Sequence, residues 1–598
     1  MTNAEIVTLL SHVAAAYSVM DEKKHYFQIV AYKKASEAIE SMSTQLTDQY
    51  EEGKLDAVPG IGPSIKKHLT DVFENGKSQH LEKVLATVPS SMFPLLDIPS
   101  FGPKKAYRLV TEFHLTNPKT VVQDLQKIAK QGKIAKLDGF GPKSEHDILQ
   151  AISEYGMGVN KSSRMVLPYA SEIADKIVHY MKRCPQAVQV ETLGSMRRKK
   201  ETIGDIDVAV ATKDPKKVID YFVNYPYKDR ILEKGDATAS ILISGGKHID
   251  LMVQPVGSFG SLLQHFTGSK EHNIKLREYA LKKDVSLSEY GIKKITEKSK
   301  TQKVRESDQT QTYDSEEKFY NALGLDWIPP EIRENTGEIE AALHHTLPKL
   351  IELKDIKADF HLHSSFPIEP SHDLGQDTIE TMAKYAEKLK YHSIGFSEHN
   401  PSQKNHTKEE MKRLVEQRNH VIDQVQKITK SVRIYKLLET DILPSGNLAI
   451  DNSVLNILDA TIVSVHSVFS MNKNDMTKRV INGLSHKKAK ILAHPTGRLI
   501  DKRPGYELEW EELFAFCKKH NKALEINAWP YRLDLSDILV KRAISKGVNL
   551  VIDTDSHAVS QMNLMRYGVD VARRGWAEKK NIINTWPPEK IRSWLLST

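Results

Sequence analysis

The C-terminal part of this 598-residue chain repeats one pattern, a short apolar, β-rich run that in most copies ends in a histidine or a carboxylate. Seven such runs alternate with helical stretches from residue 355 onwards: IKADFHLHS, HSIGFSEHN, VRIYKLLETD, ATIVSVHS, AKILAHPTG, KALEINA and VNLVIDTDSH. Alternating strands and helices predict a parallel sheet or barrel. Because the active site of a (β/α) barrel lies at the C-terminal ends of its strands, we expect these polar side chains to meet at one mouth.

Two of the runs carry pairs of candidate metal ligands. His361 and His363 are two residues apart, as are Asp555 and His557, so each pair faces one side of its strand. Imidazole and carboxylate together suit Zn²⁺, Mn²⁺ or Fe²⁺ rather than Ca²⁺. We therefore predict a metal site that begins at these two strand ends.

The other candidates have ordinary structural explanations when each is taken alone. His466 and His494 could be satisfied core histidines, Glu439 an ion-pair partner and His399 a strand cap. The prediction depends on their shared position at strand ends. Eight or nine such groups exceed what one ion requires, so we expect a multinuclear site.

Three copies of a glycine turn occupy the first 155 residues: VPGIGPSIKKHL (58–69), IPSFGPKKAYRLV (98–110) and LDGFGPKSEHDIL (137–149). Their spacing could indicate a helical solenoid, or turns in which glycine supplies a positive φ. A glycine turn followed by proline and lysine also exposes backbone N–H groups at a helix N-terminus, where a DNA phosphate can bind. Three copies favour sequence-independent DNA binding. The candidate residues are Gly60, Gly62, Gly102 and Gly141.

A different constellation lies in the middle of the chain, in ETLGSMRRKKETIGDIDVAVAT (191–212). Asp205 and Asp207 are two apart in an apolar strand, so both face one side, and a second strand contributes Asp250. The pair alone could be a solvated strand edge. Buried together, however, like charges need a cation, and oxygen ligands suit Mg²⁺. The Gly194–Ser195 turn, with Arg197 and Arg198 close by, can bind phosphate oxygens.

LGSMRRKKETIGDIDVAV strongly resembles the palm motif of family X DNA polymerases, within the nucleotidyltransferase superfamily. HFTGSKEHNIKLREYALKKDVSLSEYGI (265–292) resembles the nucleotide-binding segment of that family, and the resemblance covers essentially the whole chain. It implies that the three aspartates hold two ions, Mg²⁺ or Mn²⁺, at a catalytic site. The nucleotide- or template-contacting residues that it implies are Gly194, Ser195, Arg198, Gly268, Asn273 and Arg277.

Two positions depart from the animal members of the family. His265 stands where they have a tyrosine packed near the sugar, so the sequence does not predict how ribonucleotides are rejected. His68 stands where they have a Schiff-base lysine, and Lys66 and Lys67 face other directions on the expected helix. Because neutral imidazole is a poor Schiff-base nucleophile, we expect no efficient deoxyribose-phosphate lyase activity.

ILAHPTGRLIDKRPGYELEWEEL, ALEINAWPYRLDLSD and DTDSHAVSQMNLMRYGVDVARRGW resemble the polymerase-linked branch of the PHP domain, a seven-stranded barrel phosphoesterase with a three-metal site. An insertion, FPIEPSHD, displaces the usual ninth ligand; Asp373 is the candidate and His372 its rival. The second motif usually reads Asp-His and here reads Glu398-His399. The resemblance implies a Mn²⁺ or Zn²⁺ cluster of three ions held by His361, His363, Asp373, His399, Glu439, His466, His494, Asp555 and His557.

Together these patterns predict a multidomain α+β and α/β protein: a helical helix-hairpin-helix N-terminal region, a nucleotidyltransferase palm with thumb, and a C-terminal distorted (β/α)7 PHP barrel. The polar stretch 294–315 is expected to be an exposed loop. The expected divisions are a helical DNA-binding domain (1–80), a second helix-hairpin-helix region (81–158), the palm (159–260), a nucleotide-binding terminal polymerase subdomain (261–320), a linker (321–354) and the PHP phosphoesterase domain (355–598).

The resemblance implies a DNA polymerase that fills short gaps in repair from dNTPs on gapped or primer–template DNA. It implies a PHP-domain 3′–5′ exonuclease, with abasic-site endonuclease or 3′-phosphatase activity as further options. One alternative is a DNA-binding repair scaffold with decayed catalytic sites, which the retained aspartates argue against. The other is a phosphoesterase acting on a small metabolite, which the glycine turns argue against.

Bulk properties limit the setting of the protein. There is no run of eighteen apolar residues and no secretory signal pattern at the N-terminus, so we expect no membrane span or export. Two cysteines exclude a disulfide framework and favour a cytoplasmic protein. The net charge of +8 permits nucleic-acid binding without proving it. We expect a monomer, and the sequence leaves the identity of any protein partner open.

Overall fold

The computed structural model describes two compact units, Met1–Arg164 with Ile243–Lys247, and Met165–Leu242 with His248–Thr598. It describes the chain except at residues 2, 41–45, 52–54, 56–57, 59–60, 97, 99–100, 157–163, 244–246, 296–309, 501–504 and 598. None of the helices in the described ranges is long and apolar enough to span a bilayer. Cys184 and Cys517 are buried free thiols.

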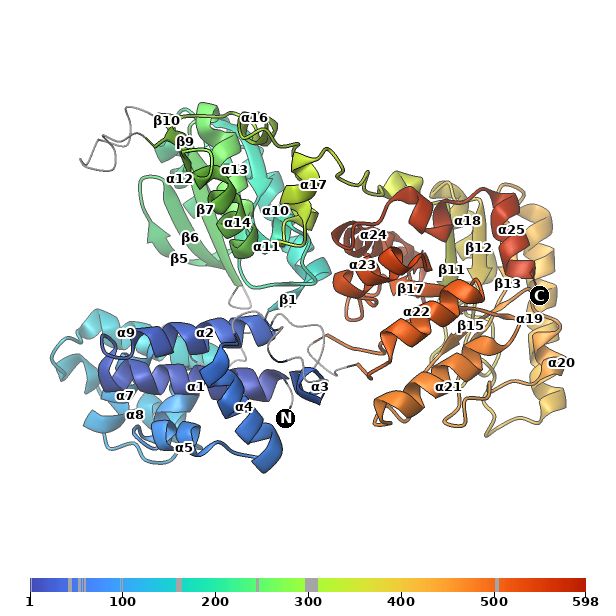
Figure 1. Ribbon diagram of the computed structural model, residues 1–598, viewed down its shortest axis with the longest axis horizontal. Helices are drawn as coiled ribbons and strands as arrows, with labels where there is room; N and C mark the ends of the chain where they lie inside the picture. Colours follow the sequence, from blue (N-terminus) through green and yellow to red (C-terminus); the bar gives the residue numbers. More distant parts are fainter. Residues whose placement is uncertain are drawn as a thin grey trace. The chain divides into compact units, whose positions relative to one another are not determined.

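The first unit is helical around one apolar core, in which α1 and α2 lie alongside each other (Figure 1). Three of its helices, α4, α7 and α9, begin with Pro63, Pro103 and Pro142, because a proline at the first helical position loses no hydrogen bond. Leu69, Leu109 and Ile148 on these helices are buried in the common core. The helices are α1 (Asn3–Asp21), α2 (Tyr26–Glu40), α3 (Leu46–Glu51), α4 (Pro63–Asn75), α5 (Gln79–Leu85), α6 (Phe93–Leu96), α7 (Pro103–Glu112), α8 (Val121–Lys130) and α9 (Pro142–Gly156).

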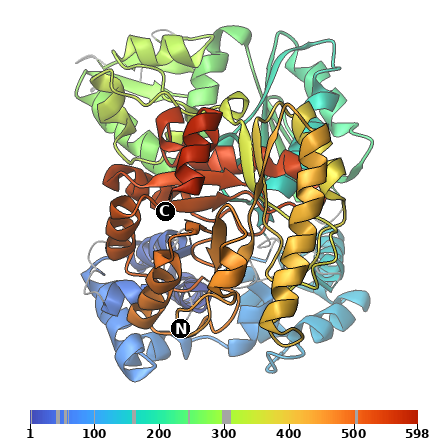
Figure 2. The same cartoon turned by 90° about the vertical axis from the view of Figure 1, so that its right-hand side faces the viewer.

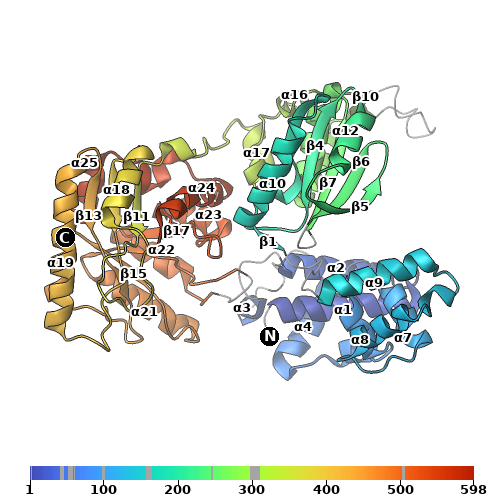
Figure 3. The ribbon, with the colours of Figure 1, turned by 180° about the vertical axis from the view of Figure 1, so that it is seen from behind.

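The second unit starts with a five-stranded sheet in the order β2-β4-β7-β6-β5, of which Figure 3 shows β4, β7 and β6 side by side. The central strands β4 and β7 are parallel, and β2 pairs with β4 in the antiparallel sense. Phe259 and Leu262 of helix α13 pack on Ala209 and Ala211 of β4. The elements are β1 (Met165–Val166), α10 (Leu167–Met181), β2 (Ala187–Thr192), α11 (Gly194–Arg197), β3 (Thr202–Ile203), β4 (Ile206–Thr212), α12 (Pro215–Val223), β5 (Lys228–Lys234), β6 (Thr238–Ile243), β7 (Lys247–Gln254) and α13 (Phe259–Thr267).

A smaller layer follows, in which helix α14 packs beside the antiparallel sheet β10-β9-β8. Ile328, Ile332 and Ile339 are buried in the same apolar cluster as Leu276 of α14. Residues 321–354, expected from sequence to be a linker, therefore contribute side chains to this core. The elements are α14 (Lys270–Leu281), β8 (Val285–Ser288), β9 (Gly291–Lys294), β10 (Thr310–Gln311), α16 (Glu316–Ala322) and α17 (Glu338–Leu343).

The C-terminal part of this unit is built from parallel strands that pair in chain order. β13 and β14 are two segments of one interrupted strand, because Leu437 N donates to Phe396 O at 2.9 Å and Glu439 N donates to Ser397 O at 3.1 Å. The ring closes where Leu362 bridges Ser556 and His363 N donates to Ser556 O at 2.8 Å. The strands are β11 (Ala358–Leu362), β12 (Ser393–Phe396), β13 (Arg433–Lys436), β14 (Glu439–Asp441), β15 (Thr461–Ser464), β16 (Ala489–Leu492), β17 (Ala523–Asn527) and β18 (Asn549–Asp553).

Helices surround these strands, and Figure 2 shows the long helix α19, in gold, alongside them. Inside the ring, Phe360, Ile462 and Val551 form an apolar core that Trp594 and Leu595 of the last helix help to cover. Apolar side chains thus form the core of the ring, and most of the predicted histidines and carboxylates lie at or just beyond the C-terminal ends of its strands. The helices are α18 (Ile379–Lys388), α19 (Lys408–Ile428), α20 (Asn452–Leu455), α21 (Lys473–Ser485), α22 (Trp510–Lys519), α23 (Asp537–Lys546), α24 (Met565–Arg574) and α25 (Pro588–Leu596).

Candidate active sites

The central sheet of the second unit brings two of the predicted aspartates directly together. Asp207 on β4 and Asp250 on β7 are Cα partners in the parallel ladder, and Asp205 immediately precedes β4. Burial, together with the charges of Asp250 and Asp205, raises the pKa of Asp207 to about 7. The Ser240 hydroxyl donates to Asp250 Oδ1. The site therefore carries carboxylates that repel one another unless a proton or a cation lies between them.

The predicted phosphate turn lies against this carboxylate pair. Gly194 has φ +54°, and a Cβ built on it would lie 2.6 Å from Asp207 Oδ2. Leu193 N donates to Asp207 O at 2.8 Å, which holds the turn on the strand. A side chain at position 194 would thus collide with the carboxylate, so glycine is required here. Ser195 follows Gly194 in the short helix α11 and is half-buried.

The two predicted nucleotide-contacting segments also meet. Arg198 Nη1 donates to the carbonyl of Thr267, and a Cβ built on Gly268 would lie 3.0 Å from the same nitrogen. Arg198 Nε donates to Glu334 Oε1 at 3.1 Å. The guanidinium that sequence assigned to a phosphate is therefore bonded to protein oxygens.

Asn273 and Arg277 lie on the following helix, α14. Asn273 donates from Nδ2 to His265 O at 2.7 Å and accepts from Gln264 at 2.9 Å. Burial lowers the pKa of His265, with Glu289 opposing and Arg277 reinforcing the shift, so Arg277 lies near that ring. Arg277 itself is exposed. Asn273 thus supports the backbone at His265, and Arg277 is available to a ligand on the surface.

Arg197, the other arginine of the phosphate turn, is engaged within the fold. It is ion-paired with Glu316 at 2.7 Å, and Arg333 pairs with the same carboxylate at 2.6 Å. Burial opposes ionisation of Glu316, but the two arginines outweigh it and lower its pKa to about 2. Arg197 therefore joins the short helix α11 to helix α16. Its role is structural, unlike the ligand-binding role predicted for Arg198.

In the glycine turns of the first unit, glycines with unoccupied space beside them lie at helix N-termini. Gly62 (φ −80°) and Gly102 (φ −81°) are extended N-cap residues, so the positive-φ explanation is wrong for both. A Cβ built on Gly62, Gly102 or Gly141 would meet nothing within 4 Å. The space in front of α4, α7 and α9 is therefore open to a ligand at the glycine position. Gly60 lies outside the described residues.

His68, the residue in place of the Schiff-base lysine, is buried on α4 and stacks on His80, with ring centroids 4.3 Å apart. His80 Nε2 lies 2.9 Å from the hydroxyl of Tyr17. Burial and the neighbouring His80 lower the pKa of His68, so its imidazole is neutral near pH 7.

At the other end of the chain, the strand ends bring the predicted histidines and carboxylates together around Glu439. Glu439 Oε2 lies 3.1 Å from His361 Nε2 and 3.0 Å from His399 Nδ1. Its Oε1 lies 2.9 Å from His494 Nε2 and 3.4 Å from His466 Nε2. One buried carboxylate therefore faces four imidazoles that come from four different strand ends.

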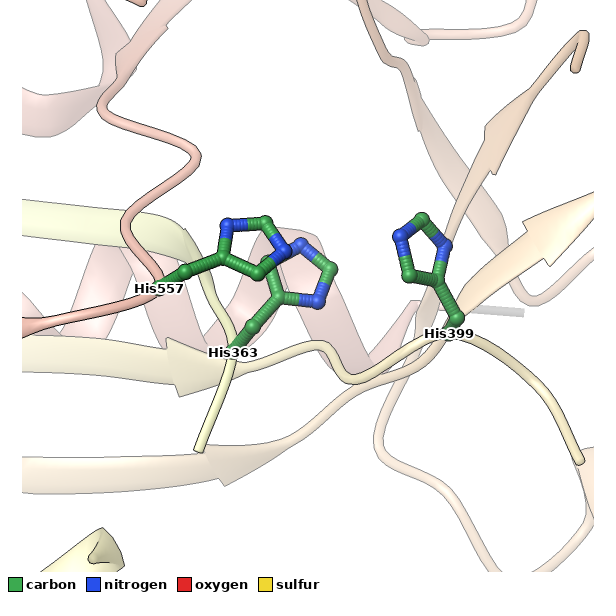
Figure 4. Close-up of side chains that lie close together, drawn as sticks. All are labelled: His363, His399 and His557. Carbon is green, nitrogen blue, oxygen red and sulfur yellow. The ribbon is translucent and has the colours of Figure 1, made fainter. Parts of the chain in front are cut away.

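The remaining predicted ligands complete a second side of the cluster. His363 Nε2 lies 3.2 Å from Asp555 Oδ1, and the His363 and His557 rings stack 4.1 Å apart, with His399 facing them (Figure 4). Asp373 Oδ1 lies 3.2 Å from His399 Nε2, and its Oδ2 lies 3.4 Å from His557 Nε2. The insertion therefore still delivers Asp373 to the cluster.

His372, the rival of Asp373, also reaches the cluster, where it forms a candidate metal-ligand group with Asp441 and His466. Glu398 lies beside the cluster. His372 Nε2 contacts Asp441 Oδ1 at 3.2 Å on the rim of the cluster. Glu398 accepts from Arg418 at 2.7 Å and from the Ser364 hydroxyl at 2.5 Å. Glu398 thus pairs with a buried arginine beside the cluster and does not contact the imidazoles at its centre.

The cluster fits divalent metal ions. Within the described part of the chain, His361 Nε2, His363 Nε2, His399 Nδ1, Glu439 Oε2 and His557 Nε2 are buried without a hydrogen-bond partner. Three overlapping groups of these ligand atoms lie within 4.8 Å of one another: His363–His399–His557, His361–His363–Glu439 and His399–Glu439–His466. Buried polar atoms that converge without partners are costly unless a ligand binds them.

The protonation states suit the same conclusion. Burial and the neighbouring His557 lower the pKa of His363 to about 3, so this ring is a neutral ligand. Burial opposes ionisation of Glu439, but the adjacent histidines His399 and His361 hold its pKa well below the ordinary value. Neutral imidazole and ionised carboxylate are the forms that bind metal ions. Burial opposes protonation of His361 and His399, but the surrounding carboxylates outweigh it and raise the pKa of both rings, so a metal ion that binds here would displace their protons.

Two carboxylates that contact the imidazole nitrogens facing away from Glu439 were not identified from the sequence. Glu525 Oε1 lies 2.6 Å from His361 Nδ1, and Asp441 Oδ1 lies 2.7 Å from His466 Nδ1. Carboxylates in this position orient the ring of a metal-binding histidine. Asp441 follows Glu439 by two residues on the same strand face, so the strand period could have identified it. Glu525 lies in the middle of the run KALEINA and not at its end, so its position gave no such signal.

A cavity of about 460 Å³ opens beside the cluster. Trp529 and Arg532 line it together with the ligands, and Arg532 Nε lies 3.7 Å from Asp555 Oδ2. The cavity therefore combines an aromatic ring and a cation with the candidate metal ligands, which is the chemistry that a nucleotide requires.

Two family models match parts of the chain, and one relative matches all of it. The "Helix-hairpin-helix domain" family model matches residues 1–78, and the "DNA polymerase beta thumb" model matches residues 262–334. The Bacillus subtilis (strain 168) protein "DNA polymerase/3'-5' exonuclease PolX" is 33% identical over 597 residues, which cover 100% of this chain and 99% of that protein.

Two eukaryotic relatives match about half of the chain. "DNA polymerase lambda" of Rattus norvegicus is 24% identical over 354 residues, 56% of either chain. "DNA polymerase lambda" of Arabidopsis thaliana is 24% identical over 366 residues, 55% of this chain and 62% of the relative. A carboxylate-bearing sheet followed by a polymerase thumb defines a nucleotidyltransferase. The chain belongs to the bacterial family X DNA polymerases, as the resemblance in its sequence indicated.

The pKa of Asp207 predicts a pH-dependent requirement for Mg²⁺. Because this pKa is raised to about 7, the carboxyl holds a proton below pH 7 that a cation must displace. The Mg²⁺ concentration for half-maximal nucleotide incorporation should fall about tenfold per pH unit up to pH 7 and level off above it. Titrating Mg²⁺ in primer extension from pH 6 to 8.5 measures this concentration. A Mg²⁺ requirement that does not change with pH would contradict the raised pKa of Asp207.

The outer carboxylates predict weaker metal retention when they are removed. Asp441→Asn and Glu525→Gln should each lower the affinity of the C-terminal cluster for Mn²⁺ about 10–100-fold, because His466 and His361 lose their orienting partners. Competition with a chelator, followed by metal analysis, measures this. Glu416→Gln, on the outer helix α19, is the matched control and should change nothing.

Proposed function

We propose that this family X polymerase fills short gaps in DNA at its central sheet and removes nucleotides from 3′ ends at its C-terminal cluster. The observation that carries the proposal is the presence of two separate sets of converging metal ligands in one chain. One is the Asp207–Asp250 pair, and the other is the imidazole cluster around Glu439. The name of the Bacillus subtilis relative, a DNA polymerase and 3′–5′ exonuclease, supports the same pair of activities.

At the polymerase site, Asp205, Asp207 and Asp250 would hold Mg²⁺ or Mn²⁺. The ions, when bound, supply activation of the primer hydroxyl and charge stabilisation of the pyrophosphate leaving group. Gly194 lets the turn that would bind the triphosphate lie directly against Asp207, because a Cβ at this position would meet the carboxylate. Ser195, Arg198 and Gly268 would bind the triphosphate of an incoming dNTP, with Asn273 and Arg277 on the nucleotide and template side.

We assign residues 355–598 to a distorted (β/α)7 PHP phosphoesterase barrel, with Mn²⁺ or Zn²⁺ as the cluster metal. The assignment is supported by the closed ring of parallel strands and by buried ligand atoms that lack partners. The cluster would hold three ions, which polarise the phosphodiester when bound. Asp373 is the ninth proposed ligand, and Asp441 and Glu525 orient His466 and His361.

The cavity beside the cluster favours a nucleotide as substrate. Its volume of about 460 Å³ accommodates a terminal nucleotide, with Trp529 available to stack on a base. Arg532 is 3.7 Å from Asp555, so once that carboxylate binds a metal its positive charge is available to a phosphate oxygen. An abasic-site or 3′-phosphate end would use the phosphate contact with Arg532, although an abasic site offers no base to Trp529.

The helical unit would bind the DNA backbone through the N-termini of α4, α7 and α9. Open space at Gly62, Gly102 and Gly141 supports phosphate binding there without base contacts. The proposed divisions follow the sequence: helix-hairpin-helix regions at 1–80 and 81–158, palm at 159–260, nucleotide-binding subdomain at 261–320 and connecting segment at 321–354. We propose a monomer acting in the cytoplasm, where reduced thiols such as Cys184 and Cys517 persist.

Reciprocal variants test the two-site proposal. Asp207→Asn should lower gap filling at least 10³-fold and leave 3′-end removal unchanged, because it removes a ligand from one cluster only. His361→Ala with His363→Ala should abolish 3′-end removal and leave gap filling unchanged. Labelled gapped and single-stranded oligonucleotides with Mn²⁺ measure both reactions, and loss of both activities in either variant would refute separate sites.

Variants at the glycine turns test the DNA contacts. Gly62→Val should fold normally, because φ is −80° and nothing lies within 4 Å of its Cβ, yet it should lower DNA affinity about tenfold by blocking the N-terminus of α4. Gly76→Ala, at φ +72° on the same helix, should cost about 1 kcal/mol of stability and leave DNA affinity unchanged. Fluorescence anisotropy and thermal melting separate the two effects.

A further inference from the structure

The guanidinium of Arg198, the proposed triphosphate ligand, is occupied by protein partners. Its Nε donates to Glu334 Oε1 at 3.1 Å, and Nη1 donates to the carbonyl of Thr267. Only 13% of the side chain is exposed. A carboxylate binds the same face of a guanidinium that a phosphate would bind. Glu334 therefore stands where a triphosphate oxygen has to compete.

The same carboxylate oxygen has a second arginine. Arg574 Nη1 lies 3.1 Å from Glu334 Oε1 and also donates to the backbone carbonyl of Arg198 at 2.7 Å. Its Nη2 donates to Asp537 at 2.5 Å. The Arg574 side chain is 3% exposed. Two arginines thus share one half-buried carboxylate, and Asp537 is the second anion of the network.

The charges in this network make the two arginines competitors. Burial opposes ionisation of Glu334, but Arg574, Lys200 and Arg198 outweigh it and lower its pKa. If Arg198 moves to a triphosphate, Glu334 keeps an ion-pair partner as long as Arg574 is present. Without Arg574, release of Arg198 would leave a half-buried carboxylate without a paired arginine, which is costly.

Arg574 belongs to the phosphoesterase region. It is the last residue of α24, which packs on strands β17 and β18 of the ring, where a Cβ on Gly568 would lie 2.4 Å from Ile552. Asp537 begins α23 of the same region. Glu334, in contrast, is the last residue that the polymerase thumb model matches. The network therefore links the polymerase site to the scaffold of the second site.

We propose that Glu334 and Arg574 are positioning residues that control how readily Arg198 is released to an incoming nucleoside triphosphate. The phosphoesterase region thereby sets the nucleotide affinity of the polymerase site, through a carboxylate that both regions share. This inference rests on the proposed role of Arg198 as a triphosphate ligand.

The competition predicts variants of opposite sign, measured as KM for dNTP in single-nucleotide gap filling by the full chain. Arg574→Met should raise KM about tenfold with little change in kcat, because Glu334 then pairs only with Arg198. Glu334→Gln should lower KM about threefold, because the competing charge is gone. The double variant should behave as Glu334→Gln alone, since without the carboxylate Arg574 has nothing to hold.

Arg573→Met is the matched control. Arg573 lies on the same helix and contacts Glu331 at 2.8 Å and the Ile351 carbonyl at 2.8 Å, with no bond to Glu334. It should leave KM unchanged. Removal of 3′ nucleotides by each variant reports whether α24 and the ring are folded. If Arg574→Met also loses the removal of 3′ nucleotides, the proposal is decided by the direction in which KM changes in Glu334→Gln alone.

Three results would overturn the proposal: a KM that rises in Glu334→Gln, a double variant as impaired as Arg574→Met, or an equal increase in Arg573→Met. Failure of the underlying assignment is distinguishable from these. If Arg198→Ala leaves KM for dNTP unchanged, Arg198 is not a triphosphate ligand, and the proposed polymerase contacts fail independently of the network.

Discussion

Both sites depend on polar groups that are buried together before any ligand neutralises them. Asp207 and Asp250 are adjacent on parallel strands, and Glu439 faces four imidazoles. Such arrangements are unfavourable on their own, so apolar packing has to hold them in place. In the sheet this packing comes from Phe259 and Leu262 under β4, and in the ring from the filled interior below the strand ends. The core under the sheet thus holds carboxylates that repel one another, and the core of the ring holds imidazoles and carboxylates that are desolvated together.

The two ligand sets differ in a way that separates their chemistry. The sheet offers carboxylates alone, which suit a hard ion such as Mg²⁺, whereas the ring mixes imidazole and carboxylate, which suit Mn²⁺ or Zn²⁺. The surrounding groups differ as well. Gly194 lets the predicted phosphate turn lie against the Asp207 carboxylate, while Trp529 and Arg532 line a cavity beside the imidazoles. Synthesis and removal of the same nucleotide can thus occur in one chain without a shared metal.

Much of each site could be predicted from sequence because strand period is a local property. His361 with His363 and Asp205 with Asp207 follow directly from it, and Asp373 was identified in spite of an insertion. The long-range partners could not be predicted in the same way. Arg198 is 136 residues from Glu334 and 376 from Arg574, and no periodicity links positions so far apart. Arg197 and Arg198 are adjacent residues of the same type, so the sequence does not distinguish their roles. Only the packing shows that Arg197 pairs with Glu316, whereas Arg198 is the proposed triphosphate ligand.

The segment between the two catalytic regions has more than a connecting role. Its isoleucines are buried with α14, and it presents Glu334 to Arg198 on one side and to Arg574 on the other. Thermodynamic linkage is reciprocal: if Arg574 alters the affinity for a triphosphate, then a bound triphosphate alters how tightly Arg574 holds Glu334. Nucleotide binding would then strengthen the pairing of the segment with α24. Because two arginines share the Glu334 carboxylate, binding of a nucleoside triphosphate at the polymerase site can influence the region that removes nucleotides.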